Sequence, residues 1–209
     1  MVGQPLTTAR DEILARIRSV DRTPPAPVER GYRRSGSLAR AELVELFAAR
    51  VADYRADVRL VAEDGVADAI AAAARDSSRI AVPPGLPAGW RSAELELVED
   101  HGLSARELDA LDGVITGCTV AIAETGTIIL SGRAPEGRRA LSLVPDLHIC
   151  VVRSDQIVEL VPEALAAVDP HRPLTFISGP SATSDIELSR VEGVHGPRTL
   201  VVLIVKEEP

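Results

Sequence analysis

The fold of this chain is organised around residues 117–130, which read Gly117-Cys118-Thr119-Val120-Ala121-Ile122-Ala123-Glu124-Thr125-Gly126-Thr127-Ile128-Ile129-Leu130. Two apolar runs rich in β-branched residues, 119–123 and 127–130, are typical of buried strands. Between them, the tetrapeptide 124–127 places a carboxylate and two hydroxyls where a buried strand would carry valine or isoleucine. A polar insert at this position requires either a structural or a functional explanation.

The residues alone leave both explanations open. In the structural one, the insert is a β-bulge or a crossover, Gly126 supplies a backbone conformation that other residues disfavour, and the threonines bond local amides. In the functional one, Glu124 is held at the end of a central strand, in the crevice where open α/β sheets bind their ligands.

Composition and charge restrict the class of protein. The 209 residues contain few aromatic side chains and can bury one substantial core. The net charge of −8 argues against a general attraction to nucleic acids or anionic membranes, so an anionic ligand would require a local site. Cys118 and Cys150 lie in apolar runs and are expected to be buried hydrophobes rather than a disulfide or a metal site. Two cysteines are also fewer than an iron–sulfur cluster usually requires.

The sequence shows neither a signal peptide at its start nor an apolar run long enough to span a bilayer. No segment resembles a nucleic-acid-binding module. We therefore expect a cytoplasmic protein with no membrane span and no nucleic-acid partner.

The N-terminal part is predicted to be a helix followed by an extended arm. Ile13, Ile17 and Val20 fall on one face of a helix over residues 8–20, which is the pattern of an amphipathic helix. Prolines from Pro24 onward end this helix, and a basic, proline-rich segment continues to Gly36. We predict two parts, residues 1–36 as helix and arm and residues 37–209 as an α/β domain. The arm docks on its own domain by default, and docking on a partner is the alternative.

An alternation of strands and helices predicts the fold class. The expected elements are a helix from an N-cap at Ser37 to Tyr54, strands at 58–62, 79–82, 94–98, 113–116, 147–152, 174–177 and 199–205, and helices at 66–75, from Ser104 onward and at 155–168. This rhythm indicates a largely parallel sheet with helices on both faces.

A second polar motif is Ile177-Ser178-Gly179-Pro180-Ser181-Ala182-Thr183-Ser184-Asp185-Ile186-Glu187. It is expected to follow a strand and to open a helix, so that free backbone amides point at a phosphate or a carboxylate. For Ser184 and Glu187 an ordinary capping box is the favoured interpretation. For Gly179 and Ser181 ligand binding is favoured, because a bare cap does not require Gly-Pro-Ser before it.

Two further side chains, His195 and Arg139, are candidates for the site, and a third, His148, is assigned to the core. His195, in Gly193-Val194-His195-Gly196-Pro197, is interpreted as a proton carrier or hydrogen-bond donor, with a surface turn as the alternative. Arg139 follows the central stretch and is the best candidate to bind an anion, although a solvated arginine remains equally open. His148 lies inside an apolar run and is interpreted as a core histidine with its hydrogen bonds satisfied.

Four segments together resemble the LUD-domain family. They are Ala121–Thr127, Leu143–His148, Ser178–Glu187 and Gly193–Pro197, and their order and spacing over residues 113–205 make the match specific. The part before Tyr54 matches only in its general plan of a leading helix and a linker.

The resemblance implies a three-layer α/β/α fold around a mainly parallel sheet, similar to the sugar-phosphate isomerase and CoA-transferase group. It also implies a part in the bacterial oxidation of L-lactate to pyruvate, beside two iron–sulfur partner proteins. No cofactor is predicted on this chain, and the iron–sulfur clusters are expected on the partners. The family pattern does not establish whether this chain is itself catalytic.

Our first hypothesis is a non-redox subunit that binds a small carboxylate or phosphate between the two polar motifs. Glu124 and His195 are the predicted catalytic residues, and the predicted ligand-binding residues are Thr125, Gly126, Thr127, Arg139, Gly179, Pro180, Ser181, Thr183 and Asp185. A second hypothesis is a stand-alone isomerase or CoA-transferase-like enzyme that uses Glu124 as base or nucleophile. A third is a regulatory or scaffolding module that docks through the helix over residues 8–20.

Overall fold

The structure is a computed structural model, and it describes residues 8–20, 27–75, 77–180, 182–184, 190–192 and 196–206. Contacts divide the chain into two units, Met1–Tyr32 and Arg33–Pro209. The first unit contains the predicted amphipathic helix as α1 (Ala9–Ser19), which buries none of its residues. The side chain of Thr8 caps this helix by accepting a hydrogen bond from the backbone nitrogen of Asp11.

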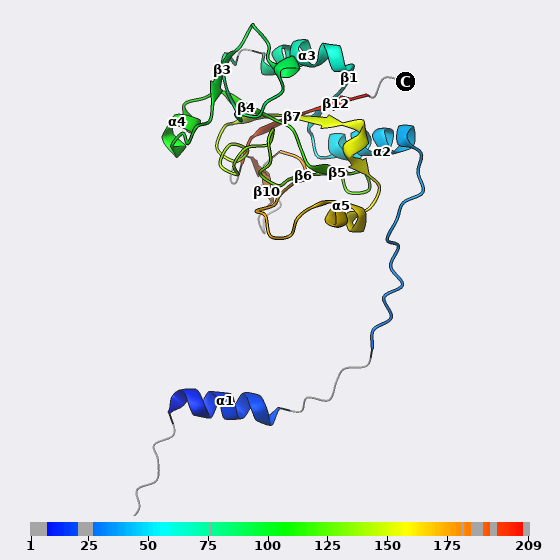
Figure 1. Cartoon of the computed structure of the whole chain (residues 1–209), viewed down its shortest axis with the longest axis vertical. Helices are drawn as coiled ribbons and strands as arrows, with labels where there is room; N and C mark the ends of the chain where they lie inside the picture. The colour runs from blue at the N-terminus through cyan, green and yellow to red at the C-terminus, as the bar shows by residue number, and fades with distance from the viewer. Residues whose placement is uncertain are drawn as a thin grey trace, which may run out of the picture. The chain divides into compact units, whose positions relative to one another are not determined.

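The second unit is built on a six-stranded sheet in which every neighbouring pair is parallel (Figure 1). In spatial order its strands are β1 (Asp57–Val61), β12 (Thr199–Val205), β7 (Leu147–Arg153), β4 (Gly113–Thr116), β2 (Arg79–Val82) and β3 (Glu96–Glu99). The central strands β7, β4 and β12 are buried almost throughout, as expected of parallel strands that are covered on both faces.

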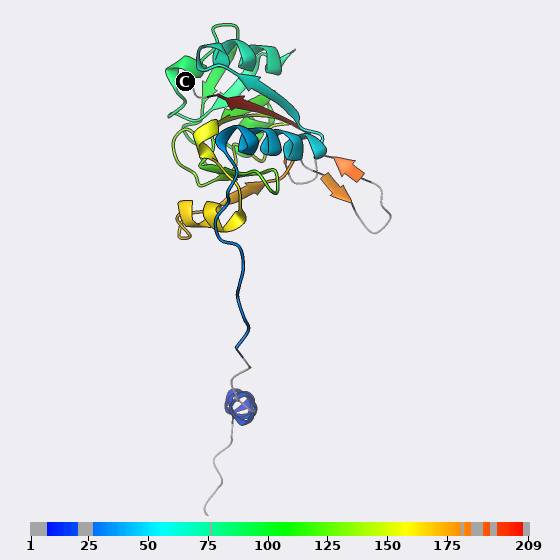
Figure 2. The same ribbon diagram turned by 90° about the vertical axis from the view of Figure 1, so that its right-hand side faces the viewer.

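Helices cover both faces of this sheet. On one face, α3 (Val66–Ala74) packs Val66 and Ile70 against alternate residues of the strands, among them Ile149 and Leu203. On the other face, α2 (Arg40–Asp53) packs Phe47 against strand residues such as Val202. Figure 2 shows α2 lying along β1 and β12 on that face. The helix α4 (Ala105–Asp109) lies beside the sheet and buries Leu108.

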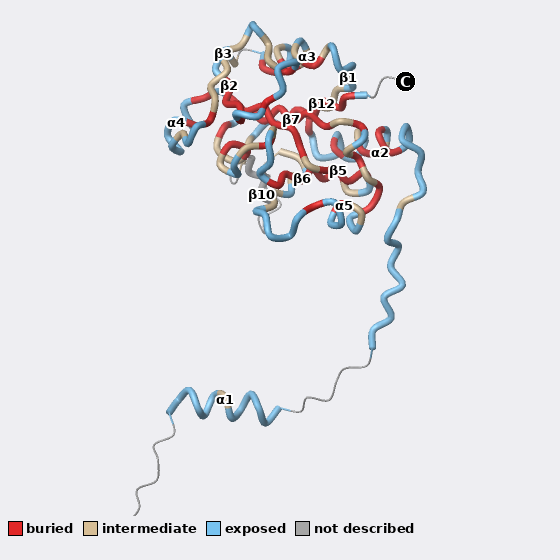
Figure 3. Tube along the Cα trace, viewed as in Figure 1, coloured by how far each residue is buried: buried red, intermediate tan, exposed pale blue. Residues whose placement is uncertain are grey.

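A second, four-stranded sheet shares the face that α2 covers, and the sequence did not predict it as a separate sheet. Its order is β8 (Ile157–Val158), β5 (Val120–Ile122), β6 (Thr127–Leu130) and β9 (Thr175–Ile177), with antiparallel pairing between β5 and β6 and between β6 and β9. One side of β5 and β6 faces the core of the large sheet, and the other side packs on α5 (Val161–Ala167). Figure 3 shows buried residues concentrated in these sheets.

The predicted three-layer α/β/α class with a mainly parallel sheet is confirmed. The position of Glu124 at the end of a central strand is wrong, because residues 120–130 form a hairpin of the second sheet. The chain reverses over residues 123–126, where Gly126 has a φ of +61°. This agrees with the structural explanation of the insert, in which glycine supplies a conformation that other residues disfavour.

Two predicted helices are wrong. The motif after Ile177 does not open a helix, because residues Ala182–Ser184 form β10 and pair antiparallel with β11 (Arg190–Glu192). The helix expected over 155–168 is divided into the 3₁₀ helix η3 (Ser154–Gln156), the strand β8 and the shorter α5. Pairing of β8 with β5 is a tertiary contact that local periodicity does not reveal. Two further 3₁₀ helices are η1 (Glu63–Gly65) and η2 (Ala88–Trp90).

Two smaller predictions on helix ends have different outcomes. The capping box at α4 is confirmed, with Ser104 accepting from the backbone of Glu107 and Glu107 accepting from that of Ser104. The N-cap of α2 is Ala39 rather than Ser37.

In the part of the chain that the structure describes, no helix has the length and apolar character needed to cross a bilayer.

We predict that Gly126→Ala destabilises the second unit by about 1–3 kcal/mol. The substitution adds a Cβ at a φ of +61°, and this atom would lie 2.8 Å from the carbonyl carbon of Arg50. Gly89→Ala is the matched control, because a Cβ at Gly89 meets no atom within 4 Å. Urea unfolding of the two variants and the wild type measures the difference. Equal stability of the two variants would contradict the prediction.

Candidate functional site

A short chain of hydroxyl groups joins the two polar motifs. The hydroxyl of Thr125 donates to that of Thr127 at 2.8 Å, and Thr127 Oγ1 lies 2.8 Å from Ser178 Oγ. This contact follows from the antiparallel pairing of β6 with β9, in which Ile128 is the partner of Ile177. The structure therefore brings together two segments that lie about fifty residues apart in the sequence.

Gly126 and Gly179 allow both motifs to approach the end of α2. Gly179 has a φ of +89°, and a Cβ there would lie 2.5 Å from the Cβ of Tyr54. At Gly126 the added atom would meet the backbone of Arg50. Close backbone approach accounts for both glycines, and their predicted part in ligand binding stays a prediction.

Glu124 lies at the surface, where it pairs with an arginine that precedes α2. Arg33 Nη2 lies 3.1 Å from Glu124 Oε1, and Arg33 Nη1 lies 3.2 Å from Glu159 Oε1. The side chain of Glu124 is 50% exposed. It does not line either of the two cavities described below.

Glu159 anchors the segment that leads into α2. Its buried carboxylate accepts hydrogen bonds from the backbone nitrogens of Ser37 at 2.6 Å and Leu38 at 2.9 Å. These amides, together with Arg33, lower the pKa of Glu159. The backbone nitrogen of Gly36 donates to Glu163 at 3.0 Å. Residues 33–38, which begin the second unit, are therefore held on the rest of it through carboxylates that follow β5 and β8 and through Glu163 of α5.

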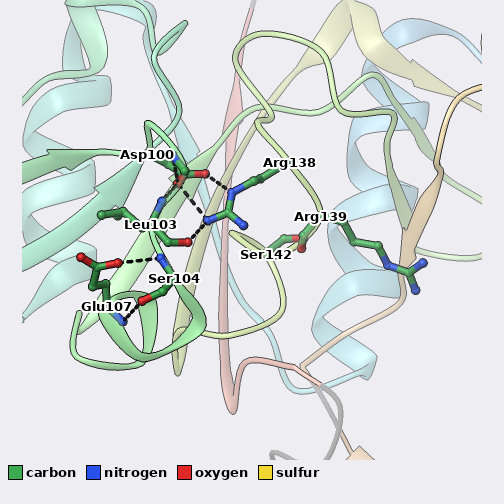
Figure 4. Close-up of polar contacts among 8 residues, drawn as sticks. Asp100, Leu103, Ser104, Glu107, Arg138, Arg139 and Ser142 are labelled. Atoms are coloured by element: carbon green, nitrogen blue, oxygen red, sulfur yellow. Dashed lines mark hydrogen bonds and ion pairs between the residues drawn. The ribbon is translucent and has the colours of Figure 1, made fainter.

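Arg138 and Arg139, which are adjacent in the loop after β6, point in opposite directions (Figure 4). Arg138 reaches the buried carboxylate of Asp100, with nitrogen–oxygen distances of 2.6 and 2.9 Å. This contact, with the backbone amides of Leu103 and Gly102, lowers the pKa of Asp100. In Figure 4, Arg139 extends away from this pair. Across the described ranges, its guanidinium has no hydrogen bond or ion pair.

Arg139 lines a cavity of about 200 Å³ whose wall is rich in cations and hydroxyls. Arg138 and Arg172 also line it, and Arg172 donates to the carbonyl oxygens of Ser131 and Gly132. Thr175, at the start of β9, also lines this cavity. Because the other two arginines are engaged, Arg139 is the cation of this wall that is available to an anionic ligand.

A second cavity, of about 140 Å³, adjoins the first and shares Ser142 and Thr175 with it. It lies between β9 and the first residues of β7 and β12, and Gly179, Pro180 and Gly196 line it. We call the two cavities together the inter-sheet groove. The groove brings Arg139, Gly179 and Pro180 into one region, and it adds Ser142, Thr175 and His148, which the sequence did not assign to a site.

His148 combines the predicted core position with access to the groove. It is 1% exposed, and its Nε2 lies 2.8 Å from Thr116 Oγ1 on the neighbouring strand β4. Burial lowers the pKa of this histidine to about 4, so the ring is neutral at physiological pH. Its prediction as a satisfied core histidine is confirmed for Nε2. One feature of the sequence could have indicated that His148 lines a cavity. It is the second residue of its strand and therefore lies close to the polar loop before that strand.

Four predicted residues cannot be placed. Ser181, Asp185 and His195 lie outside the described residues, and Thr183 lies in β10, where only the backbone is described. Their roles stay predictions.

Cys118 and Cys150 are free and buried, as expected, and burial raises the pKa of Cys150 to about 12. Among the residues that the structure describes, no group of three or more His, Cys, Asp or Glu side chains is placed to hold a metal ion.

Comparison with known proteins gives consistent matches. Residues 41–205 match the family described as LUD domain. Lactate utilization protein C of Deinococcus radiodurans is 52% identical over 187 residues, which cover 87% of this chain and 85% of that protein. An uncharacterized protein of Neisseria meningitidis serogroup B is 29% identical, covering 95% of this chain and 94% of that protein. The crystal structure of a DUF162 family protein from Deinococcus radiodurans has 48% identity and a TM-score of 0.71, covering 81% of this chain and 99% of that chain.

We predict that stability falls as the pH drops from about 6.5 to about 4, partly because of His148. Its folded pKa lies below the usual value of 6.5, so the unfolded chain takes up the proton first. The neutral ring is compatible with the fold above pH 6.5, and the loss by pH 4 amounts to about 3 kcal/mol. Urea unfolding of wild type and His148→Gln at a series of pH values isolates this contribution. Parallel pH profiles for the two chains would contradict it.

Proposed function

This chain belongs to the LUD-domain family, and from that premise we propose that it is a non-redox subunit of a bacterial L-lactate utilisation system. The relative from Deinococcus radiodurans that carries the name Lactate utilization protein C supports this role, because it matches over most of both chains. In the proposed system L-lactate is oxidised to pyruvate. The electrons pass to iron–sulfur partner proteins, and this chain binds a small anion.

The observation that carries the proposal is the position of Arg139 in the inter-sheet groove. A guanidinium without a partner among the described residues, next to a cavity that hydroxyl groups also line, is suited to bind a carboxylate or a phosphate. The chain has a net charge of −8, so it does not attract anions in general, and binding requires such a local cation. Arg138 and Arg172 add positive potential while their own hydrogen bonds hold the wall in place.

The hydroxyls of Ser142 and Ser178 extend the polar lining along the groove. The hydrogen bond between Ser178 and Thr127 positions this lining, which gives the threonines a part in orienting the ligand. Glu124 remains proposed as a proton acceptor, and His195 as the residue that closes the site. In the structure Glu124 pairs with Arg33, so a ligand or partner that uses its carboxylate would compete with that arginine.

We predict that Arg139→Gln weakens the binding of L-lactate or pyruvate at least tenfold, which corresponds to about 1.4 kcal/mol. Thermal shift over a ligand titration measures this effect, since a ligand that binds the folded chain raises its melting temperature by mass action. Arg133→Gln is the matched control, because Arg133 is an exposed arginine of the same loop that lines neither cavity. A wild-type chain that none of lactate, pyruvate and phosphate stabilises would refute the proposed anion site.

We also predict that Glu124→Gln, a nearly isosteric change, leaves the chain folded and slows growth on L-lactate as the carbon source. The assay uses a bacterium that carries this chain as its only copy, with growth on glucose as the reference. Arg33→Gln separates two causes, because it removes the ion pair and retains the carboxylate of Glu124. Wild-type growth of the Glu124→Gln strain on lactate would show that the charge is dispensable.

A further inference from the structure

A third cavity, of about 270 Å³, lies at the carboxyl ends of the strands of the large parallel sheet. Residues that follow three of these strands line it, namely Glu63 after β1, Trp90 after β2 and Gly117 after β4. Arg153, the last residue of β7, lines it as well. Among the described residues, none lines both this cavity and the inter-sheet groove. We call it the strand-end cavity.

The order of the strands marks this edge of the sheet as a position for a ligand. From β2 the chain continues to β3 on one side, whereas from β4 it continues, through the second sheet, to β7 on the other side. Open parallel sheets bind their ligands in the crevice that such a divergence leaves at the carboxyl ends of the strands. The strand-end cavity occupies that crevice, because Trp90 and Gly117, which follow the neighbouring strands β2 and β4, both line it.

The inner wall of the strand-end cavity is mainly apolar. Trp90 is 6% exposed and belongs to the core that α3 covers. Two rings border Gly117, since a Cβ there would lie 2.8 Å from Cγ of Pro135 and 3.5 Å from the indole ring of Trp90. The side chain of Gln156 is held by the protein, because its amide nitrogen donates to the carbonyl oxygen of Cys118 at 2.6 Å. The inner part of the cavity is therefore suited to an apolar group of a ligand.

A pair of opposite charges lies at the solvent end of the cavity. Arg153 Nη1 is 3.0 Å from Glu63 Oε2, and the two side chains are 42% and 50% exposed. This contact uses one oxygen of the carboxylate and one nitrogen of the guanidinium, and each group can make further hydrogen bonds. A simple anion or cation that contacts one member of the pair meets the like charge of the other. A ligand that carries both charges avoids this repulsion.

We propose that the strand-end cavity binds a small α-amino acid with an apolar side chain. The ammonium group donates to Glu63, the carboxylate accepts from Arg153, and the side chain fills the space beside Trp90 and Pro135. An α-amino acid carries its two charges on adjacent carbons, a spacing comparable with the 3.0 Å between the two protein groups. This site is distinct from the proposed anion site at Arg139 and does not depend on it.

Tryptophan fluorescence reports on this site alone, because Trp90 is the only tryptophan of the chain and lines the cavity. We expect L-leucine and L-phenylalanine to change the emission of the full-length chain in a saturable manner. The analogues without the ammonium group are isocaproate and hydrocinnamate, and those without the carboxylate are isoamylamine and phenethylamine. Each lacks one of the two charge contacts and is expected to bind roughly tenfold more weakly. If neither amino acid binds, or if an analogue binds as tightly as its parent, the proposal is overturned.

The decisive variant is Glu63→Gln, which removes one charge at an exposed position. We expect affinity for the amino acid to fall roughly tenfold, whereas binding of isocaproate does not weaken, because the like charge that opposes this anion is gone. Asp155→Asn is the matched control, since Asp155 also pairs with Arg153, at 3.5 Å, but does not line the cavity. Unchanged amino-acid binding by Glu63→Gln, or an equal loss in Asp155→Asn, overturns the proposal.

Discussion

The antiparallel pairing of β6 with β9 is the constraint on which the groove depends. It places Thr175 and Ser178, at the two ends of β9, opposite the amino-terminal ends of β7 and β12. Thr175 lines both cavities, and Ser178 joins the tetrapeptide 124–127 through its hydrogen bond to Thr127. Without this pairing the groove would lose the hydroxyl groups that Thr175 and Ser178 contribute to its lining. The apolar sides of β5 and β6 hold the smaller sheet in position by packing on α5 and on the central core.

Buried carboxylates organise the polar loop on the other side of the groove. Asp100 takes Arg138 and two backbone amides, so one of two adjacent arginines becomes a structural group. The buried side chain of Glu136 accepts from the backbone nitrogens of Ser131 and Arg133 and from the hydroxyl of Thr119. Buried charges of this kind are costly unless they are fully bonded, and removing one partner is strongly destabilising. The loop is therefore held in a conformation that leaves Arg139 available to a ligand.

Glu124 has a different setting from the one that its sequence position suggests. The turn that contains it faces the segment 33–38, and Arg33 links Glu124 to Glu159. Glu159 is the better buried of the two and also accepts the amides of Ser37 and Leu38. The same group of carboxylates thus holds residues 33–38 on the rest of the second unit. A catalytic role for Glu124 and attachment of this segment compete for one carboxylate.

The sequence by itself determined the parallel sheet, because apolar runs and their periodicity indicate which short segments are buried strands. The strands β2 and β12, for example, have the predicted bounds. It also identified Arg139 and the two polar motifs as unusual, because charged and small residues interrupt apolar patterns there. Only the tertiary structure decided that residues 120–130 belong to a second sheet and that Arg138, unlike Arg139, has an ion-pair partner among the residues that the structure describes. It alone showed that His148 reaches the groove. Strand partners, ion pairs and cavities are contacts between residues far apart in the chain, and local patterns carry no information about which distant partner a residue meets.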